Sequence, residues 1–156
     1  MKILAIETSC DDTAIAILEV KQGKYNVLSN IVSSQAIHQN YGGVFPMMAK
    51  REHQANLVPV LMQALKQAKL LKEKVLVNPT TVKNRRTFKS VQKILEKENT
   101  LFESVKKFLE THKKPKIDMI AVTHGPGLEP CLCVGVNFTK ALSYFWNIPI
   151  IPVNHI

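Results

Sequence analysis

The chain has 156 residues, of which 46% are hydrophobic and 21% charged, and it contains three cysteines. This length suits one domain, the composition excludes a disordered or collagen-like chain, and three cysteines are too few for a disulfide framework. No apolar run reaches the roughly 18 residues of a membrane span, and the N-terminus turns acidic too early for a signal peptide. We therefore expect a cytoplasmic protein with no membrane partner.

The positive charge is concentrated in one third of the chain. The whole sequence carries 21 Lys/Arg and 12 Asp/Glu, a formal charge of +9. Residues 66–116 hold 15 of the basic and 5 of the acidic residues, a net charge of +10, so the remainder is close to neutral. Such a segment suits a polyanion such as RNA, and it equally suits a solvated, Lys-rich helical face.

Three strands are expected at the start of the chain. Mostly apolar runs at 2–6, 13–20 and 25–32 are separated by a polar turn and then by Gln22-Gly23-Lys24, a hairpin signal. The chain therefore opens with an antiparallel meander, whereas a simple dinucleotide-binding unit would pass from its first strand into a helix.

A long helix should follow a glycine-containing loop. Pro46 suits the first helical position, and apolar residues keep helical spacing from there to about residue 71. Pro59 lies inside this helix and predicts a kink. The basic stretch 73–89 has no clear period, so we interpret it as an exposed loop or insertion.

Two further helices are predicted at 90–98 and 101–111, each with an apolar stripe. Thr100 and Glu103 have the spacing of a capping box, which places a helix break near Asn99.

The end of the chain predicts a strand at 117–123, a buried helix at 131–146 and a strand at 148–153. The resulting order of elements implies an α/β fold, in which helices pack on a mixed sheet.

Two loops carry residues that suit ligand binding. The turn between the first two strands contains Thr8, Ser9, Cys10, Asp11 and Asp12. Its backbone N–H groups and hydroxyls could face a phosphate, and its carboxylates could hold a metal or a metal-bound water. A polar hairpin turn of the same composition needs no function.

The second loop follows a buried strand and opens a helix. Gly125 and Gly127 would let the backbone approach an anion there, or they serve only the geometry of the connection. His155 follows the last strand, where an imidazole could bind a metal, act as a base or be structural.

Three other residues are interpreted as structural. Cys131 and Cys133 are two positions apart, which is not the spacing of a zinc or redox CxxC pair, so we expect small core residues. His53 stands beside Arg51 and Glu52 and is expected to be exposed.

Four segments of the chain carry a family resemblance. In chain order they are MKILAIETSCDDTAIAIL, GGVFPMMAKREHQANLVPVL, VTHGPGLEPCLCVGVNFTKAL and IPIIPVNHI. They resemble the tRNA adenosine threonylcarbamoyltransferases of the TsaD type, formerly described as glycoproteases. The second is similar to that family's GGVxPExASRxH segment, and the last runs into its NHxEGH metal motif. The matches cover residues 1–65 and 117–156.

The resemblance implies an actin-like ATPase (ribonuclease H-like) lobe with helices on both faces of the sheet. Residues 1–156 would be the N-terminal lobe of a two-lobe protein, with a basic insertion at about 72–116 and the second lobe absent. Alone, this chain would be an inactive fragment.

The implied reaction transfers a threonylcarbamoyl group from threonylcarbamoyl-AMP to N6 of adenosine 37 of tRNA. Asp11 and Asp12 would be the catalytic candidates, and Thr8, Ser9, Cys10, Gly125 and Gly127 would line the substrate cleft. His155 would be one ligand of an iron or zinc ion, with the other ligands outside these residues. The implied partners are tRNA and other proteins of the same pathway, including a paralogue of the same fold.

The basic segment supplies the candidate tRNA contacts Lys83, Arg85, Arg86 and Lys89.

The chain departs from the family pattern at several positions. Asp12 and Met47 stand where Glu is usual, and Lys50 stands where Ser is usual. Two alternatives stay open: a non-catalytic dimerising paralogue and a small-metabolite kinase of the same superfold. A metalloprotease is disfavoured, because the sequence has no HExxH motif.

Overall fold

The computed structural model describes residues 1–74 and 82–156, and the side chains of 1–74 and 87–156. Its elements in chain order are β1 (Lys2–Glu7), β2 (Asp12–Lys21), β3 (Lys24–Ser34), the 3-10 helix η1 (Ala36–Tyr41), α1 (Pro46–Gln67), α2 (Val82–Ile94), α3 (Asn99–Thr111), β4 (Met119–Gly125), α4 (Glu129–Trp146) and β5 (Ile150–Asn154). No helix of the described residues is long and apolar enough to cross a membrane.

The strands form one mixed sheet in the order β3-β2-β1-β4-β5. β1, β2 and β3 pair antiparallel, as the predicted meander requires, while β4 pairs parallel with both β1 and β5. The β2–β3 hairpin turns at Gln22 and Gly23, both of which have a positive φ. The α/β class, the antiparallel start and the mixed sheet are thus confirmed.

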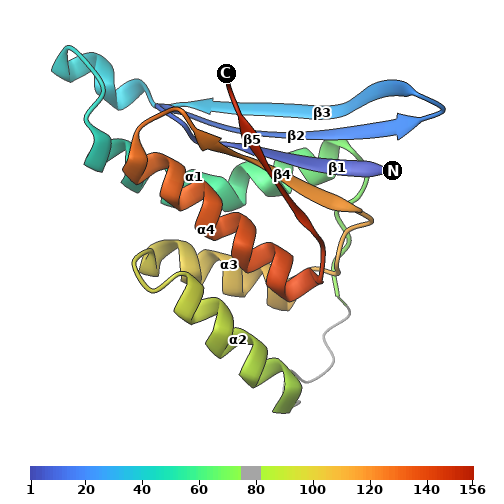
Figure 1. Cartoon of the computed structure of the whole chain (residues 1–156). Coiled ribbons are helices and arrows are strands. Elements are labelled where there is room, and N and C mark those ends of the chain that lie inside the picture. Colours follow the sequence, from blue (N-terminus) through green and yellow to red (C-terminus); the bar gives the residue numbers. More distant parts are fainter. Residues whose placement is uncertain (75–81) are drawn as a thin grey trace.

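All the described α-helices lie on one side of this sheet (Figure 1). α1 and α4 pack against the strands and against each other, and α2 and α3 form an outer layer on α4 and α1. The expectation of helices on both faces is not met within the described residues.

Successive side chains along each strand point to opposite faces of the sheet, and the two faces differ. Leu4 and Ile6 of β1 and Ile15 and Ile17 of β2 are buried toward the helices. The opposite face carries small residues, so it leaves a shallow hollow of about 250 Å³. The alanines that line this hollow are Ala5, Ala14, Ala16 and Ala121.

The basic segment is more helical than its sequence predicts. α2 spans Val82–Ile94. The predicted loop at 73–89 therefore overlaps the first part of α2, and the helix predicted at 90–98 continues past its end. The part of that loop at 75–81 lies outside the described residues. The many Lys and Arg residues of α2 obscure its apolar periodicity in the sequence, because charged residues can cover most of the surface of an exposed helix.

α3 has the buried apolar stripe that its sequence predicts, formed by Leu101, Phe102, Val105, Phe108 and Leu109. The predicted capping box is wrong. The helix begins at Asn99 with Glu98 as its N-cap and no side-chain cap hydrogen bond, so Thr100 lies inside the first turn.

Candidate functional site

The three loops singled out in the sequence meet at one edge of the sheet. β1, β4 and β5 run parallel, so their carboxyl ends at Glu7, Gly125 and Asn154 lie together. The amide of Leu128 donates to the carbonyl of Ser9 at 2.7 Å, and the amide of His155 donates to the carbonyl of Gly125 at 2.9 Å. This edge is where open parallel sheets bind ligands.

Gly127 is required by the close approach of two of these loops. A Cβ at this position would lie 2.6 Å from the Ser9 carbonyl oxygen and 2.8 Å from the Ser9 Cβ. A Cβ at Gly125 would meet no atom within 4 Å. The two glycines are therefore not equivalent, since only Gly127 is fixed by packing.

Thr8 joins the end of β1 to α4. Its side chain is fully buried, and its Oγ1 donates to the carbonyl of Cys131 at 3.0 Å. Gly135, one turn further along α4, gives this hydroxyl room, because a Cβ there would collide with Thr8 Oγ1. The Thr8 hydroxyl is thus used within the fold, and the residue has no surface exposed at the turn.

His53 is buried, so the expectation of an exposed histidine is wrong. Its Nε2 lies 2.9 Å from the Cys10 carbonyl, which can only accept, so Nε2 carries the proton and donates. Its Nδ1 lies 2.8 Å from the Thr13 hydroxyl, which then donates to it. Burial lowers the pKa of His53, which keeps the ring neutral in this arrangement.

His53 therefore ties α1 to the second half of the β1–β2 turn and to the start of β2. The sequence contained a signal that the interpretation missed. Ala49, His53 and Leu57 are four residues apart, so they share one face of α1, and all three are fully buried.

The turn presents its other side chains outward. Cys10 and Asp12 are exposed and Asp11 is half-buried, while the Asp11 carbonyl accepts from the amide of Gln35 at 3.1 Å. Burial and the neighbouring Asp11 carboxylate raise the pKa of the Cys10 thiol. The turn thus offers two carboxylates and a protonated thiol to whatever binds at this edge.

His155 faces Glu7 and Thr123. Its Nε2 lies 3.0 Å from Glu7 Oε2 and 3.1 Å from Thr123 Oγ1. Burial works to raise the pKa of Glu7, but hydrogen bonds from Ser9 and Thr123 hold it below its usual value. Glu7 Oε2 is buried without another partner, so it receives a hydrogen bond when His155 Nε2 carries a proton.

These residues do not by themselves make a metal site. Within residues 1–74 and 82–156, no group of three His, Cys, Asp or Glu side chains could hold an ion. His155 with Glu7 supplies one imidazole and one carboxylate, whereas a catalytic zinc or iron site usually takes three protein ligands.

The candidate tRNA contacts lie on α2, in the outer layer of the molecule. Lys89 is exposed, and the side chains of Lys83, Arg85 and Arg86 lie outside the described residues. Among the described residues, α2 packs on α4 and α3 and not on the strands whose ends carry the loops.

The two neighbouring cysteines of α4 differ. Cys131 is buried, as expected, and burial raises its pKa to about 11. Cys133 is exposed, so its assignment to the core is wrong. Residues two apart on a helix point about 200° apart, which places the two thiols on opposite sides of α4.

The chain is similar to known proteins along most of its length. A family model described as TsaD, tRNA N6-adenosine threonylcarbamoyltransferase, matches residues 26–77 and 95–156. Proteins of that name from Thermomicrobium roseum and Fusobacterium nucleatum are 40% and 41% identical over 157 residues. Those alignments include 100% of this chain but 31% and 33% of the relatives, so the chain spans about a third of their length.

The fold is shared with a solved structure described as YeaZ from Pseudomonas aeruginosa. The TM-score is 0.52 at 13% identity, and the superposition covers 99% of this chain and 45% of that one. This likeness shows an actin-like, ribonuclease H-like fold.

Proposed function

Because this chain belongs to the TsaD family of tRNA N6-adenosine threonylcarbamoyltransferases, we propose that it forms part of an enzyme with that activity. The enzyme would move a threonylcarbamoyl group from threonylcarbamoyl-AMP to N6 of adenosine 37 in tRNA. The observation that supports this most is the meeting of the β1–β2 turn, the Gly125–Gly127 loop and His155 at one sheet edge.

The proposed step is an acyl transfer. The N6 amine attacks the carbamoyl carbonyl carbon, a C–N bond forms, the C–O bond to the phosphate breaks, and AMP leaves while N6 loses a proton. An adenine amine is a weak nucleophile, so we expect that holding the two substrates in line supplies much of the rate.

The turn residues would carry out this positioning. We assign Asp11 and Asp12 to orienting the attacking amine, because they are the carboxylates that the turn presents outward. Buried Thr8 would hold the turn in place, and the backbone of Ser9 and Cys10 would lie against the adenylate from one side. Gly125 and Gly127 would approach it from the other, since the Leu128 amide joins the two loops.

We also propose that His155 is one ligand of an iron or zinc ion, completed by residues beyond those described. When bound, the ion would polarise the carbonyl oxygen of the acyl group. The support is the position of the imidazole at the same edge, next to a carboxylate. No step is derived through this ion, because the described ligand set is incomplete.

The partners in this proposal are tRNA and a second chain of the same fold. Lys83, Arg85, Arg86 and Lys89 would contact the tRNA backbone, and a cytoplasmic location follows from this substrate. The support is the family of the chain together with the charge of α2, which carries only basic ionisable side chains.

A transfer assay tests the proposal. The protein that carries these residues is incubated with threonylcarbamoyl-AMP and unmodified tRNA, and nucleosides from the tRNA are analysed by mass spectrometry. We expect product from the wild type and a rate about 100-fold lower for Asp11→Asn. Lys24→Gln, at the tip of the β2–β3 hairpin, should leave the rate unchanged. Absence of product from the wild type, or an unchanged rate for Asp11→Asn, would refute it.

A further inference from the structure

The first half of α1 has two different faces. Ala49, His53 and Leu57 are buried, and His53 holds the β1–β2 turn. Met47, Lys50, Arg51 and Gln54 recur at spacings of three and four residues on a separate face, where they line a hollow. One helix thus connects the candidate site to a second surface.

This second surface is a basic hollow of about 410 Å³ between the starts of α1 and α3. Its lining residues are Met47, Lys50, Arg51, Gln54, Lys97 and Thr100. Three of the six are cations and none is acidic. The hollow therefore has the charge and the size for an anionic group larger than a single small ion.

A buried carboxylate pairs with one of the three cations. Glu98 is buried, with its Oε1 3.7 Å from Lys50 Nζ and its Oε2 accepting from Asn137 at 3.4 Å. Arg51 and Lys97 are exposed and form no ion pair with any residue that the structure describes. Both are available to an incoming anion.

The start of α3 adds to the positive potential. α3 has 13 residues and no side-chain cap hydrogen bond at its N-terminus, and Thr100 of its first turn lines the hollow. The first amide groups of a helix lack acceptors within the helix and carry the positive end of its dipole. Three side-chain cations and a helix start thus act on the same space.

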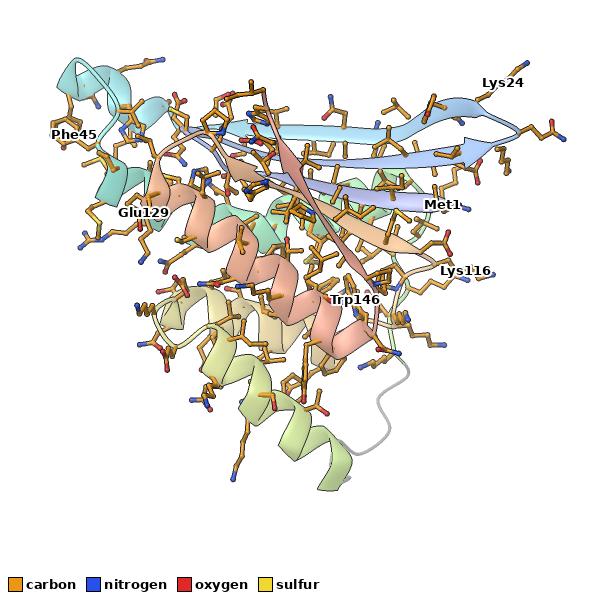
Figure 2. All side chains as sticks on the ribbon, in the orientation of Figure 1. Met1, Lys24, Phe45, Lys116, Glu129 and Trp146 are labelled. Carbon is orange, nitrogen blue, oxygen red and sulfur yellow. The ribbon has the colours of Figure 1, made fainter. Side chains whose placement is uncertain are left out.

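Exposed aromatic rings lie just before α1. Tyr41 and Phe45 pack edge to face with ring centroids 5.6 Å apart, and about half of each side chain is exposed. Phe45 lies at the end of the molecule opposite to Lys24 (Figure 2). Aromatic faces beside cations suit single-stranded RNA, whose bases stack and whose phosphates seek positive charge.

We propose that this basic hollow binds a backbone phosphate of the RNA that the enzyme modifies. The inference rests on the proposed function for the identity of the RNA. A helix with its side chains is about 10–12 Å across, so a phosphate in the hollow lies about one helix width from the β1–β2 turn. The hollow would hold the strand close to the nucleotide that reacts at the turn.

Fluorescence anisotropy with a labelled tRNA anticodon stem-loop, measured over a series of salt concentrations without adenylate, tests this proposal. The variants are Arg51→Gln, Lys97→Gln and the double variant. Lys50 is left intact because it is the ionic partner of the buried Glu98. Lys24→Gln at the tip of the β2–β3 hairpin removes the same charge far from the hollow, and thermal unfolding checks that every variant is folded.

We expect the double variant to bind the RNA about ten-fold more weakly. The slope of log affinity against log salt should fall by about 0.7–0.9, since the contact with one phosphate is lost. Lys24→Gln should match the wild type. An unchanged affinity and salt slope in the folded double variant would overturn the proposal.

Two further measurements distinguish RNA from other molecules that this hollow could bind. If inorganic phosphate or AMP binds the wild type but not the double variant, while RNA binding is equal in both, the hollow takes a free anion and the RNA assignment is overturned. If sedimentation shows that the double variant loses chain–chain association with RNA binding intact, the surface belongs to a protein partner, which also overturns it. Normal RNA binding without any transfer would instead refute the proposed function and leave this inference standing.

Discussion

The candidate site at the sheet edge and the basic hollow, which α1 connects, differ in how they are built. At the sheet edge, Thr8, His53 and Gly127 fix the loops through buried hydrogen bonds and a contact that admits no side chain. At the basic hollow, two cations of α1 and one from the turn before α3 line an open space. Substitutions at the edge should therefore change stability and activity together, whereas substitutions at the hollow should change ionic binding alone.

The largest effect is expected from Gly127→Ala. The new Cβ would collide with the backbone of Ser9, so the two loops must separate. We expect a loss of about 1–3 kcal/mol in the free energy of unfolding, measured by urea denaturation, and strongly reduced transfer. Gly43→Ala is the matched control, since its Cβ would meet nothing within 4 Å. Equal stabilities of the two variants would show that the loops are not tightly apposed.

Thr8→Val should have the next largest effect. It keeps the shape of the side chain but removes the buried hydroxyl that donates to the Cys131 carbonyl. We expect a loss of about 1–2 kcal/mol by the same denaturation measurement. Ser104→Ala removes an exposed hydroxyl that donates to Thr100, and it should cost less than about 0.5 kcal/mol. A Thr8→Val variant as stable as the wild type would contradict the role of this hydroxyl.

His53 should make stability depend on pH. Its pKa is lowered in the folded state from the ordinary 6.5, so the unfolded chain binds more protons in the window below pH 6.5. The contribution of His53 is fully present above that pH and is lost as the pH falls toward the folded pKa. The slope is at most about 1.4 kcal/mol per pH unit.

The measurement is urea denaturation of wild type and His53→Gln between pH 5 and 8. The variant should show a flatter profile in the acidic part of this window. Parallel profiles for the two proteins would mean that His53 titrates as it does in the unfolded chain.

The smallest effect is expected from Lys89→Gln on α2. Lys89 is exposed, so its removal should leave the free energy of unfolding within about 0.5 kcal/mol of the wild type. As one proposed phosphate contact, it should lower the salt slope of RNA binding by about 0.7–0.9. Anisotropy titrations at several salt concentrations would measure this slope, and an unchanged slope would remove Lys89 from the RNA contacts.

The sequence predicted the fold class for a clear physical reason, because apolar runs marked the strands. The residues alone did not predict that the loops meet, since they do not say which strands run parallel. Only the family resemblance assigned Asp11, Gly125 and His155 to one active site. Their chemical roles stay predictions, because position at an edge does not specify which group contacts a ligand.

Other features depended on contacts between distant residues and could not be predicted in the same way. His53 meets Cys10 and Thr13, which are about 40 residues away along the chain. The hollow joins Lys50 and Arg51 to Lys97, whose proximity depends on how α3 packs on α1. Exposure of Cys133, by contrast, could have been predicted from helical geometry once Cys131 was assigned to the core.

Amide hydrogen exchange with and without a non-reactive analogue of threonylcarbamoyl-AMP tests the central claim most directly. If the interlocked loops form the adenylate site, the analogue should slow exchange at residues 8–13 and 125–128 together and leave the β2–β3 hairpin unchanged. Protection confined to other segments, with these two loops exchanging as in the free protein, would contradict the assignment of the site.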